Sequence, residues 1–422
     1  MREMKDSGIE WIGEIPQNWK VRKIKYNFRR NELKNPGNLP VLSVYREYGV
    51  IPKDSRDDNH NVTSEDTSKY KYVHIGNLVI NKMKAWQGSM GVSDYTGIVS
   101  PAYYIYEINE DEIYRRYAHI LLRNVYKDEF RRISSGIREG QWDLPANGFE
   151  NIYIILPSFV EQQRIADFLY EKCAEINNLA SDIEKQIEIL EKYKKSVISE
   201  TVTKGLDPDV EMKDSGIEWI GDIPQAWDTI KIGHIFSLRN DKNTLPEDKV
   251  QLLSLYTGIG VFPTGSEYTK ASGNHAQTVE GYKIVKKNDI VVNIILAWMG
   301  ALGISDYDGV VSPAYDVYIP NMEKIIPHYF HYVFRTSGIA GECYKYGRGI
   351  MLMRWRTYSS EFRQIQVPYP SLIEQKKIAD YLDEKCNEID ILIKNKQKQL
   401  KTLEQYKKSL IYEYVTGKKE VP

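Results

Sequence analysis

The most regular alternation of hydrophobic and polar positions lies near the end of each half of the chain. After the openings at Ser158 and Ser371, no Pro or Gly occurs until Gly205 and Gly417, and apolar residues recur in steps of three and four. This pattern predicts two helices of about 45 residues, each with the stripe of a coiled coil. Each opening Ser stands three residues before a Glu, which predicts a capping box at both helix starts.

The apolar stripes have two interpretations, because each helix could pack on its own domain or the two could pack on each other. Polar interruptions fall at matching places, at Lys172 and Lys385 and again at Gln186 and Gln399, which favours mutual packing. The residues predicted to form the seam, and so to set a spacer, are Leu169, Ile176, Leu179, Ile183, Leu190, Leu382, Ile389, Leu392, Leu403 and Leu410.

The remainder of the chain shows short β-branched and aromatic runs between turn residues. Residues 288–296 are predicted to form a buried strand, followed by a tight loop at 298–303 and a returning strand toward Tyr315. Helices are predicted around residues 113–132 and 324–336. These regions are therefore predicted to be mixed α and β.

The chain is an internal duplication. The segment Met4 to Trp19 returns almost unchanged as Met212 to Trp227, and the offset grows from 208 to 213 before staying constant through Thr203 and Thr416. Small insertions therefore fall only in the middle of each repeat. A two-fold relation would make the long helices antiparallel and bring the chain termini together, whereas a translational repeat would place the domains in a row.

Composition narrows the class of protein. Three cysteines without a pairing pattern or metal-ligand spacing predict a reduced, cytoplasmic protein. No apolar run approaches the roughly 20 residues that a membrane span requires. The net charge is −1 overall, but residues 20–155 carry +4 and residues 228–368 carry +2, which is compatible with a polyanionic ligand.

The two repeats differ most at loop positions on a shared frame. After the common Tyr45 and Tyr256, Arg46 stands where the second repeat has Thr257, and Gln87 stands where it has Met299, while the Trp and Gly residues around them persist. Hydrogen-bonding side chains that vary on a fixed loop are suited to contacting base edges, although many such contacts reach phosphates instead. The candidate DNA-binding residues are Arg46, Lys82, Lys84, Gln87, Ser89, Arg138, Gln141, Thr257, Asn293, Met299, Arg348 and Arg354.

Motifs for catalysis are not found. The sequence has no phosphate-binding loop, no His-Glu-x-x-His, no dinucleotide fingerprint and no Asn-Pro-Pro-Tyr type motif, and its seven histidines show no partner pattern. We expect no catalytic residue, no metal site and no cofactor bound by this chain.

Three features in this order, each present twice, resemble the specificity subunit of type I restriction-modification enzymes. They are the Asp-Ser-Gly-Ile-Glu-Trp-Ile-Gly motif, the Val-Ser-Pro-Ala-Tyr strands at Val99 and Val311, and the Pro-Ser-x-x-Glu-Gln openings of the long helices. The resemblance implies an α+β fold with two mixed α/β target-recognition domains, separated by two long helices in an antiparallel coiled coil with a pseudo-two-fold repeat. The segments would be a first recognition domain (1–155), a first helix (156–211), a second recognition domain (212–368) and a second helix (369–422).

What this family does gives further expectations. Each recognition domain would recognise one half of a bipartite, asymmetric site in double-stranded DNA, and the helices would fix the spacer and dock two methylation subunits. Restriction subunits would complete the assembly. S-adenosylmethionine, ATP and Mg would be used by those partners, and this chain would be a non-catalytic subunit of the methyltransferase and endonuclease complex.

Two other functions stay open. The chain could be a structural or assembly protein, with two globular ends and a coiled-coil spacer. It could also be a self-sufficient nuclease or methyltransferase with an unfamiliar site. Sequence-dependent DNA retention, and activity of the isolated chain, would separate these possibilities.

Overall fold

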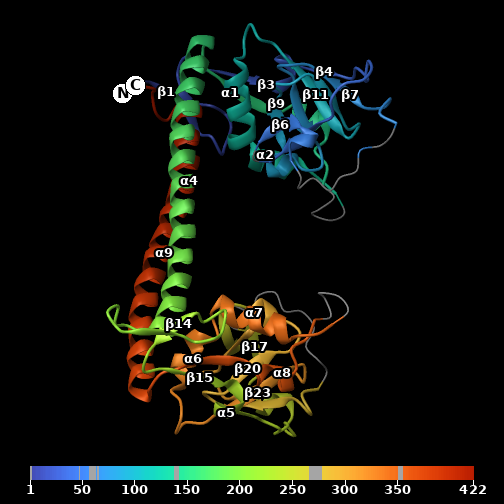
Figure 1. Ribbon diagram of the computed structural model, residues 1–422. Coiled ribbons are helices and arrows are strands. Elements are labelled where there is room, and N and C mark those ends of the chain that lie inside the picture. Colours follow the sequence, from blue (N-terminus) through green and yellow to red (C-terminus); the bar gives the residue numbers. More distant parts are fainter. Residues whose placement is uncertain are drawn as a thin grey trace. The chain divides into compact units, whose positions relative to one another are not determined.

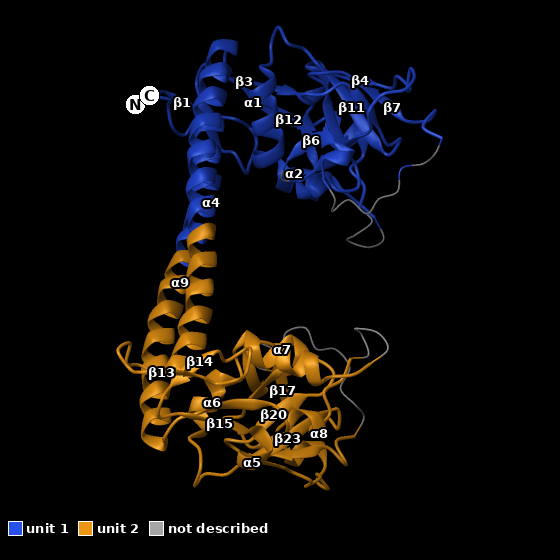
Figure 2. Ribbon diagram, in the orientation of Figure 1, with its two compact units in different colours: residues 1–183, 398–422 blue, residues 184–397 orange. Residues whose placement is uncertain are grey.

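The protein is described by a computed structural model that covers residues 2–46, 48–56, 63, 66–136, 142–265, 278–349 and 355–422. The chain divides into two compact units, shown with their elements in Figure 1 and by colour in Figure 2. Unit 1 comprises residues 1–183 and 398–422, and unit 2 comprises residues 184–397. Each unit therefore contains part of both repeats. The predicted four-segment boundaries stay a prediction, because the units divide the chain inside the long helices.

The two long helices are α4 (Phe159–Lys204, 46 residues) and α9 (Leu372–Val415, 44 residues), which confirms their predicted length. Within unit 1 the first part of α4 packs on the last part of α9, where the rings of Phe168 and Tyr414 are 4.7 Å apart. Within unit 2 the last part of α4 packs on the first part of α9, and Lys194 binds Asp390 at 2.7 Å. The pairing is therefore antiparallel and mutual, as predicted.

The predicted seam is right at most positions and wrong at two. Leu179 and Leu392 are 50% and 49% exposed. From Leu169, the buried face continues in alternating steps of four and three residues and includes Cys173 and Ala180. It therefore contains Ala180 in place of Leu179. The other predicted seam residues are buried or partly buried: Leu169, Ile176, Ile183, Leu190, Leu382, Ile389, Leu403 and Leu410.

Each recognition domain has a four-stranded antiparallel sheet with the same strand order. In the first, the order is β4 (Phe28–Asn31), β11 (Tyr103–Ile108), β8 (Leu78–Asn81) and β9 (Met90–Val92). In the second, it is β16 (Phe236–Leu238), β23 (Tyr315–Pro320), β20 (Ile290–Asn293) and β21 (Leu302–Ile304). The duplication extends to the topology of the sheet.

Hairpins and short helices surround each sheet, which confirms the mixed α and β character and both predicted helical regions. In the first domain they include β5 (Leu42–Tyr45), β6 (Gly49–Pro52), α1 (Arg115–Ile120), the π-helix η4 (Leu121–Val125) and α2 (Lys127–Ile133). The second domain has counterparts in β17 (Leu253–Tyr256), β18 (Gly260–Pro263), α6 (Pro327–Val333) and α7 (Ser337–Tyr346). The remaining strands and α-helices of the first repeat are β1 (Met4–Asp6), β2 (Glu14–Pro16), β3 (Lys20–Lys23), β7 (Lys71–Val73), β10 (Gly97–Val99), α3 (Ala146–Glu150) and β12 (Tyr153–Leu156). Those of the second are β13 (Met212–Asp214), β14 (Asp222–Pro224), β15 (Asp228–Lys231), α5 (Ile232–Ile235), β19 (Lys283–Val285), β22 (Gly309–Val311), α8 (Ser359–Phe362) and β24 (Gln366–Tyr369).

The strand predicted over residues 288–296 is shorter than expected. It ends at Asn293, whose side-chain oxygen accepts from the backbone N–H groups of Ile295 at 3.0 Å and Leu296 at 3.3 Å. A side-chain amide that bonds to the backbone two residues on forms a turn in place of the ladder. An apolar run therefore continues past the end of the strand.

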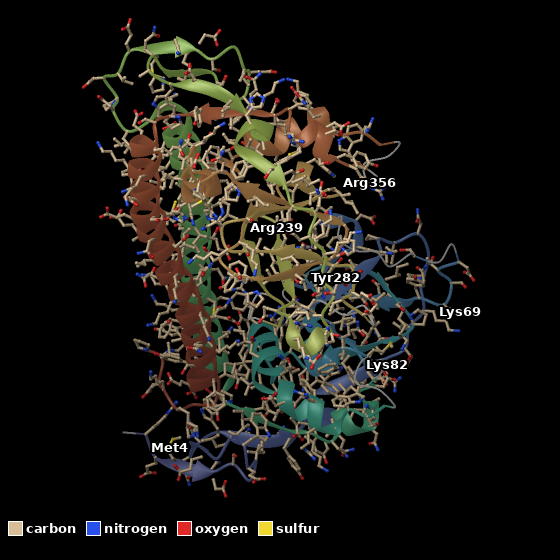
Figure 3. All side chains as sticks on the ribbon, turned by 90° about the horizontal axis from the view of Figure 1, so that it is seen from below. Met4, Lys69, Lys82, Arg239, Tyr282 and Arg356 are labelled. Carbon is tan, nitrogen blue, oxygen red and sulfur yellow. The ribbon has the colours of Figure 1, made fainter. Side chains whose placement is uncertain are left out.

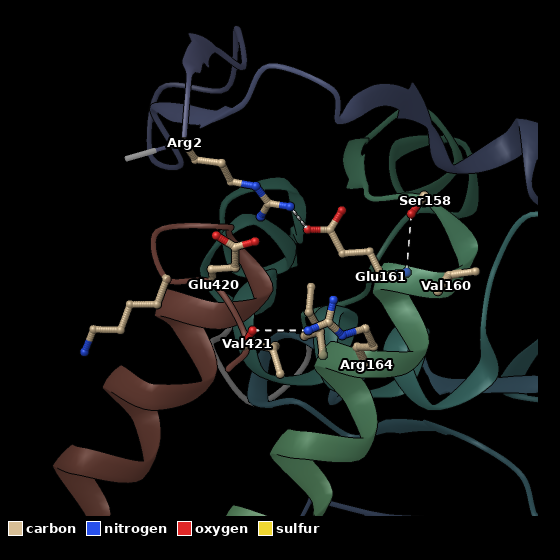
Figure 4. Close-up of a pocket in the computed structure, with 9 residues that line it drawn as sticks. Arg2, Ser158, Val160, Glu161, Arg164, Glu420 and Val421 are labelled. Atoms are coloured by element: carbon tan, nitrogen blue, oxygen red, sulfur yellow. Dashed lines mark hydrogen bonds and ion pairs between the residues drawn. The ribbon is translucent and has the colours of Figure 1, made fainter.

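The two repeated motifs meet at the start of each long helix. The indole N–H of Trp19 donates to the carboxylate of Glu161 at 3.1 Å, and that of Trp227 donates to Glu374 at 3.0 Å. Glu374 also closes a reciprocal capping box with Ser371, as predicted. At the first helix only the Ser158 hydroxyl caps, because the Glu161 carboxylate also binds Arg2 (Figure 4).

A buried glutamine fastens each helix start to the adjoining recognition domain. The side chain of Gln162 accepts from the N–H of Tyr114 at 2.9 Å and donates to the carbonyl of Glu112 at 2.9 Å. Gln375 accepts from the N–H of Ile326 at 2.8 Å in the same way. Both glutamines are fully buried, so these bonds satisfy the polar atoms of their side chains as well as backbone groups of the domain.

The far end of each helix enters the core of the other repeat's domain. The buried Tyr117 hydroxyl donates to the carbonyl of Val415 at 3.3 Å, and the Tyr329 hydroxyl donates to that of Val202 at 2.9 Å. Both chain ends also lie in unit 1, where Arg164 donates to the carbonyl of Val421 at 3.4 Å (Figure 4). Of the two arrangements that the sequence left open, the two-fold relation, which brings the termini together, is the one observed.

Candidate nucleic-acid interface

The turn between β5 and β6 places two predicted contact residues together. The guanidinium of Arg46 donates to the side-chain oxygen of Gln87 at 2.8 Å, although the residues are 41 positions apart. Gln87 ends a short 3-10 helix (Ala85–Gln87) that follows the sheet strand β8. The hydrogen bond places a donor-rich and an amide side chain next to each other, which is the chemistry that contacts guanine and adenine edges.

The π-helix η4 of the same domain stabilises the turn between β5 and β6. Arg123 donates from Nε to the backbone carbonyl of Arg46 at 3.1 Å, and a second guanidinium nitrogen reaches the same oxygen. Added Cβ atoms at Gly49 and Gly91 would each lie 3.2 Å from the His119 ring, so this close packing favours glycine. Burial, together with the nearby Arg123 charge, lowers the pKa of His119 to about 4, so its imidazole is neutral at pH 7.

A groove in unit 1 runs from this turn to the paired helices. Its volume is about 1040 Å³, and its walls come from α1, η4, α2, α4 and α9. Trp11, Leu169 and Ile411 contribute apolar surface, and Asp128 is the one carboxylate among the described residues that line it. The cationic side chains of the lining are Arg46, Arg123, Lys127, Lys407 and Lys408.

The other candidates of the first domain have different surroundings. Lys84, which precedes the 3-10 helix Ala85–Gln87, is exposed, whereas Lys82 binds Asp143 at 2.6 Å on a part of the domain away from the paired helices (Figure 3). That hydrogen bond raises the pKa of Lys82. Ser89 is only 4% exposed, so its hydroxyl is not accessible to a duplex in this conformation. Arg138 and Gln141 lie outside the described residues.

The candidates of the second domain do not form a comparable pair. Thr257 and Met299 occupy the places of Arg46 and Gln87, and Met299 is 52% exposed. The Asn293 side chain is used by its own turn. Arg348 binds Glu361 at 3.1 Å and covers the Tyr358 ring at 5.2 Å. Arg354 lies outside the described residues.

Sequence comparison missed several residues of this region. Arg123 was not proposed, although Arg335 occupies its place in the second repeat and donates to the carbonyl of Ile259 in the same role. Their shared offset of 212 was the available signal. Lys407 and Lys408 were missed because they belong to the other repeat and reach the groove only through antiparallel helix pairing.

Within the ranges that the structure describes, no cluster of three or more His, Cys, Asp or Glu side chains could hold a metal ion. Among the described helices, none is both long and apolar enough to cross a membrane.

The family comparison shows which family the chain belongs to. The model described as "Type I restriction modification DNA specificity domain" matches residues 12–189 and again residues 224–402. The chain belongs to this family. It is a specificity subunit of a type I restriction-modification system, and the two matches correspond to its two repeats.

Relatives and solved structures agree along the whole length. The chain is similar to the putative type I restriction enzyme MjaX specificity subunit of Methanocaldococcus jannaschii, at 25% identity over 96% of this chain and 95% of that protein. It is also similar to the MjaVIII specificity subunit of the same organism, at 26% identity over 96% and 93%. A chain from the structure of type I R-M complex assembly and conformational transition matches with a TM-score of 0.69, at 12% identity over 96% and 99%. The HsdS subunit from Thermoanaerobacter tengcongensis matches with a TM-score of 0.55, at 12% identity over 96% and 98%.

Proposed function

We propose that each recognition domain of this specificity subunit contacts one half of a bipartite, asymmetric DNA site. The supporting observation is that one backbone frame carries different side chains at the same turn. The first domain presents Arg46 bonded to Gln87, whereas the second presents Thr257 and Met299. Arg and Gln donate to and accept from purine edges, whereas Thr and Met offer a short hydroxyl and an apolar surface suited to a thymine methyl group. The two half-sites therefore differ.

The same proposal assigns the remaining parts of the family's activity. The paired helices set the spacer between the half-sites and dock two methylation subunits, and restriction subunits join the complete assembly. This chain supplies no catalytic group, so S-adenosylmethionine, ATP and Mg act in those partners. Because its ligand is DNA, we place the chain in the cytoplasm.

The central test substitutes the turn of one domain and leaves the other unchanged. Arg46→Ala, in complex with the methylation subunits, is expected to weaken discrimination at the first half-site by about 1–3 kcal/mol per base pair contacted. Discrimination at the second half-site should stay as in the wild type. The matched control is Thr257→Ala, and binding is measured with duplexes altered in one half-site at a time.

The outcomes separate the proposal from its alternatives. Equal loss at both half-sites would refute the assignment of one domain to each half. A complex that retains DNA without any sequence preference would favour the structural or assembly protein. Methylome sequencing of cells carrying the chain with its methylation subunit would give both half-sites and the spacer directly.

The spacer has its own test. Adding seven residues to each helix, between Glu184 and Lys195 and at the matching place in α9, extends each helix by about 10 Å. The preferred spacer is then expected to lengthen by about three base pairs, since B-DNA rises about 3.4 Å per base pair. A changed half-site sequence with an unchanged spacer would contradict the role of the helices as the spacer.

A further inference from the structure

We propose that the groove of unit 1 binds the DNA backbone, and that the lysines of α9 contact phosphates there. This inference rests on the proposed function. It adds that a long helix touches the DNA directly in one unit, beyond fixing a spacer and docking partners. It also predicts that DNA binding by unit 1 depends more strongly on salt than DNA binding by unit 2.

The lysines lie where their charge is directed into the groove. Lys407 donates from Nζ to the side-chain oxygen of Asn177 on α4 at 2.7 Å, so its stem crosses the helix pair. Lys408 pairs with Glu404 one turn away at 2.7 Å, and both of those side chains are largely exposed. An exposed pair of this kind contributes little and can exchange its partner for a phosphate at small cost.

The groove also connects these lysines to the turn that carries the base-contacting candidates. Arg46, Gln87, Lys407 and Lys408 line the same space. Half to two-thirds of the hydrogen bonds that proteins make to DNA go to phosphate and sugar, and they hold the duplex in register for the base contacts. A strand whose bases meet the turn would have its backbone within reach of the α9 lysines.

Charge favours nucleic acid over a protein segment as the occupant. The lining carries five cationic side chains and one described carboxylate, Asp128, along a space of about 1040 Å³. Its apolar surface includes Leu169, which is fully buried, and Ile411, which is 6% exposed, so these residues already pack in the core of unit 1. The accessible apolar surface of the groove includes Trp11 and Tyr170, which are 36% and 41% exposed, and the charged part of its lining is mainly basic.

The matching positions of unit 2 have a different charge. Asn177 is replaced by Asp390, which binds Lys194 at 2.7 Å. Tyr170 is replaced by Asp383, which is held by His328 at 2.7 Å and by the Tyr332 hydroxyl at 2.6 Å. The lysine that corresponds to Lys407 is therefore neutralised within the protein, and we assign the phosphate contacts of the helix to unit 1 alone.

The experiment measures the salt dependence of DNA affinity for the assembled complex. Each phosphate contact contributes about 0.9 to the slope of log affinity against log salt. The double variant Lys407→Gln with Lys408→Gln should lower this slope by about 2 and weaken binding on the order of 10- to 30-fold near physiological salt. Its preference for the bases of both half-sites should stay as in the wild type. The matched control, Lys194→Gln with Lys195→Gln, should leave the slope unchanged.

The Lys408→Gln variant alone covers the case in which loss of Lys407 disturbs the helix pair. The Lys408 side chain is exposed, so the fold should persist in this variant. The slope of log affinity against log salt should fall by about 1. An unchanged slope in both variants, or an equal fall in the control, would overturn the inference. Loss of the methylation subunits without a change in slope would assign the lysines to a protein partner and would overturn it as well. Failure of the proposed function has another sign, namely a wild-type complex without half-site preference.

Discussion

In each unit the recognition domain contacts the paired helices through bonds between side chains and through bonds from side chains to the backbone. The first class differs between the two units, and the second is largely the same in both. In unit 1, Arg116 covers the ring of Tyr170 at 5.1 Å and pairs with Asp167 at 3.3 Å. In unit 2, the corresponding His328 binds Asp383 at 2.7 Å. These exposed contacts between side chains have changed completely since the duplication.

Apart from the indole bonds of Trp19 to Glu161 and of Trp227 to Glu374, the bonds that have stayed the same end on the backbone. Gln162 and Gln375 bind main-chain N–H groups, Tyr117 and Tyr329 bind helix carbonyls, and Arg123 and Arg335 bind turn carbonyls. A backbone carbonyl is present whatever residue occupies its position, and a backbone N–H is present in every residue except proline, so substitution of the partner seldom removes the bond. The comparison teaches that the frame of each unit depends on side chain to backbone bonds, which leaves the surface free to diverge.

The strongest test exchanges one domain for the other. Replacing residues 228–368 with a second copy of residues 20–155 should give a subunit whose half-sites are identical, because the shared frame accepts either set of loops. Methylome sequencing of cells with the chimera and its methylation subunit checks this. Persistence of the original second half-site would show that residues outside the exchanged segment determine specificity.

The next test removes the glutamine side chains that bind the backbone in each unit. Gln162→Ala and Gln375→Ala should each lower the free energy of unfolding of their unit by about 1–3 kcal/mol, because partly buried backbone N–H groups lose their partner. Hydrogen exchange resolved by peptide measures each unit separately. Gln397→Ala, at an exposed position of α9, is the control and should have little effect. A large loss of stability from one of the two glutamine substitutions and none from the other would show that the two glutamine contacts are not equivalent.

A third test uses pH. Burial, and then the charge of Arg335, lowers the pKa of His331 to about 3, as burial beside Arg123 lowers that of His119 to about 4. The unfolded chain, with a histidine pKa near 6.5, takes up protons first, so stability present at pH 7 is lost as pH falls toward 4. Each histidine should contribute a loss of about 2 kcal/mol between pH 7 and pH 5.

Unfolding in urea at the two pH values gives this loss, and His119→Asn should reduce it in unit 1 only. An equal pH dependence in the variant and the wild type would mean that other groups cause the change.

The smallest expected effect concerns the ion pair between the helices of unit 2. Asp390→Asn would recreate there the Lys–Asn contact of unit 1, in which Lys407 binds Asn177. Because exposed ion pairs contribute about 0–1 kcal/mol, stability should change by less than that. Thermal unfolding at low and high salt would detect it, and a change above about 2 kcal/mol would show that the pair is more than a surface contact.

Sequence alone predicted what depends on local pattern. Helix length followed from the capping serines and from the lack of Pro and Gly, and both long helices end within a few residues of the prediction. The sequence could not decide whether Leu179 and Leu392 lie in the seam. Two heptad registers both contain Leu169 and Ile176, and they differ only at the positions in between. The end of β20 depended on a hydrogen bond of Asn293 that an apolar run does not reveal.

The candidate site shows the same limit on a larger scale. Arg46 and Gln87 were found by comparing repeats, since both lie on loops that differ. The groove was not found, because Lys408 is 362 positions from Arg46 along the chain and the helix pairing alone brings them together.

The entry of each helix end into the opposite domain has a consequence for biosynthesis. Tyr117 finds its partner at Val415, and residues 398–422 belong to the compact unit that residues 1–183 begin. A nascent chain emerges from the ribosome N-terminus first, so the unit that is begun first stays incomplete until residues 398–422 have been made. The later half has all of its parts before then. A stop codon directly after residue 397 would therefore damage unit 1 most and leave unit 2 with all of its residues.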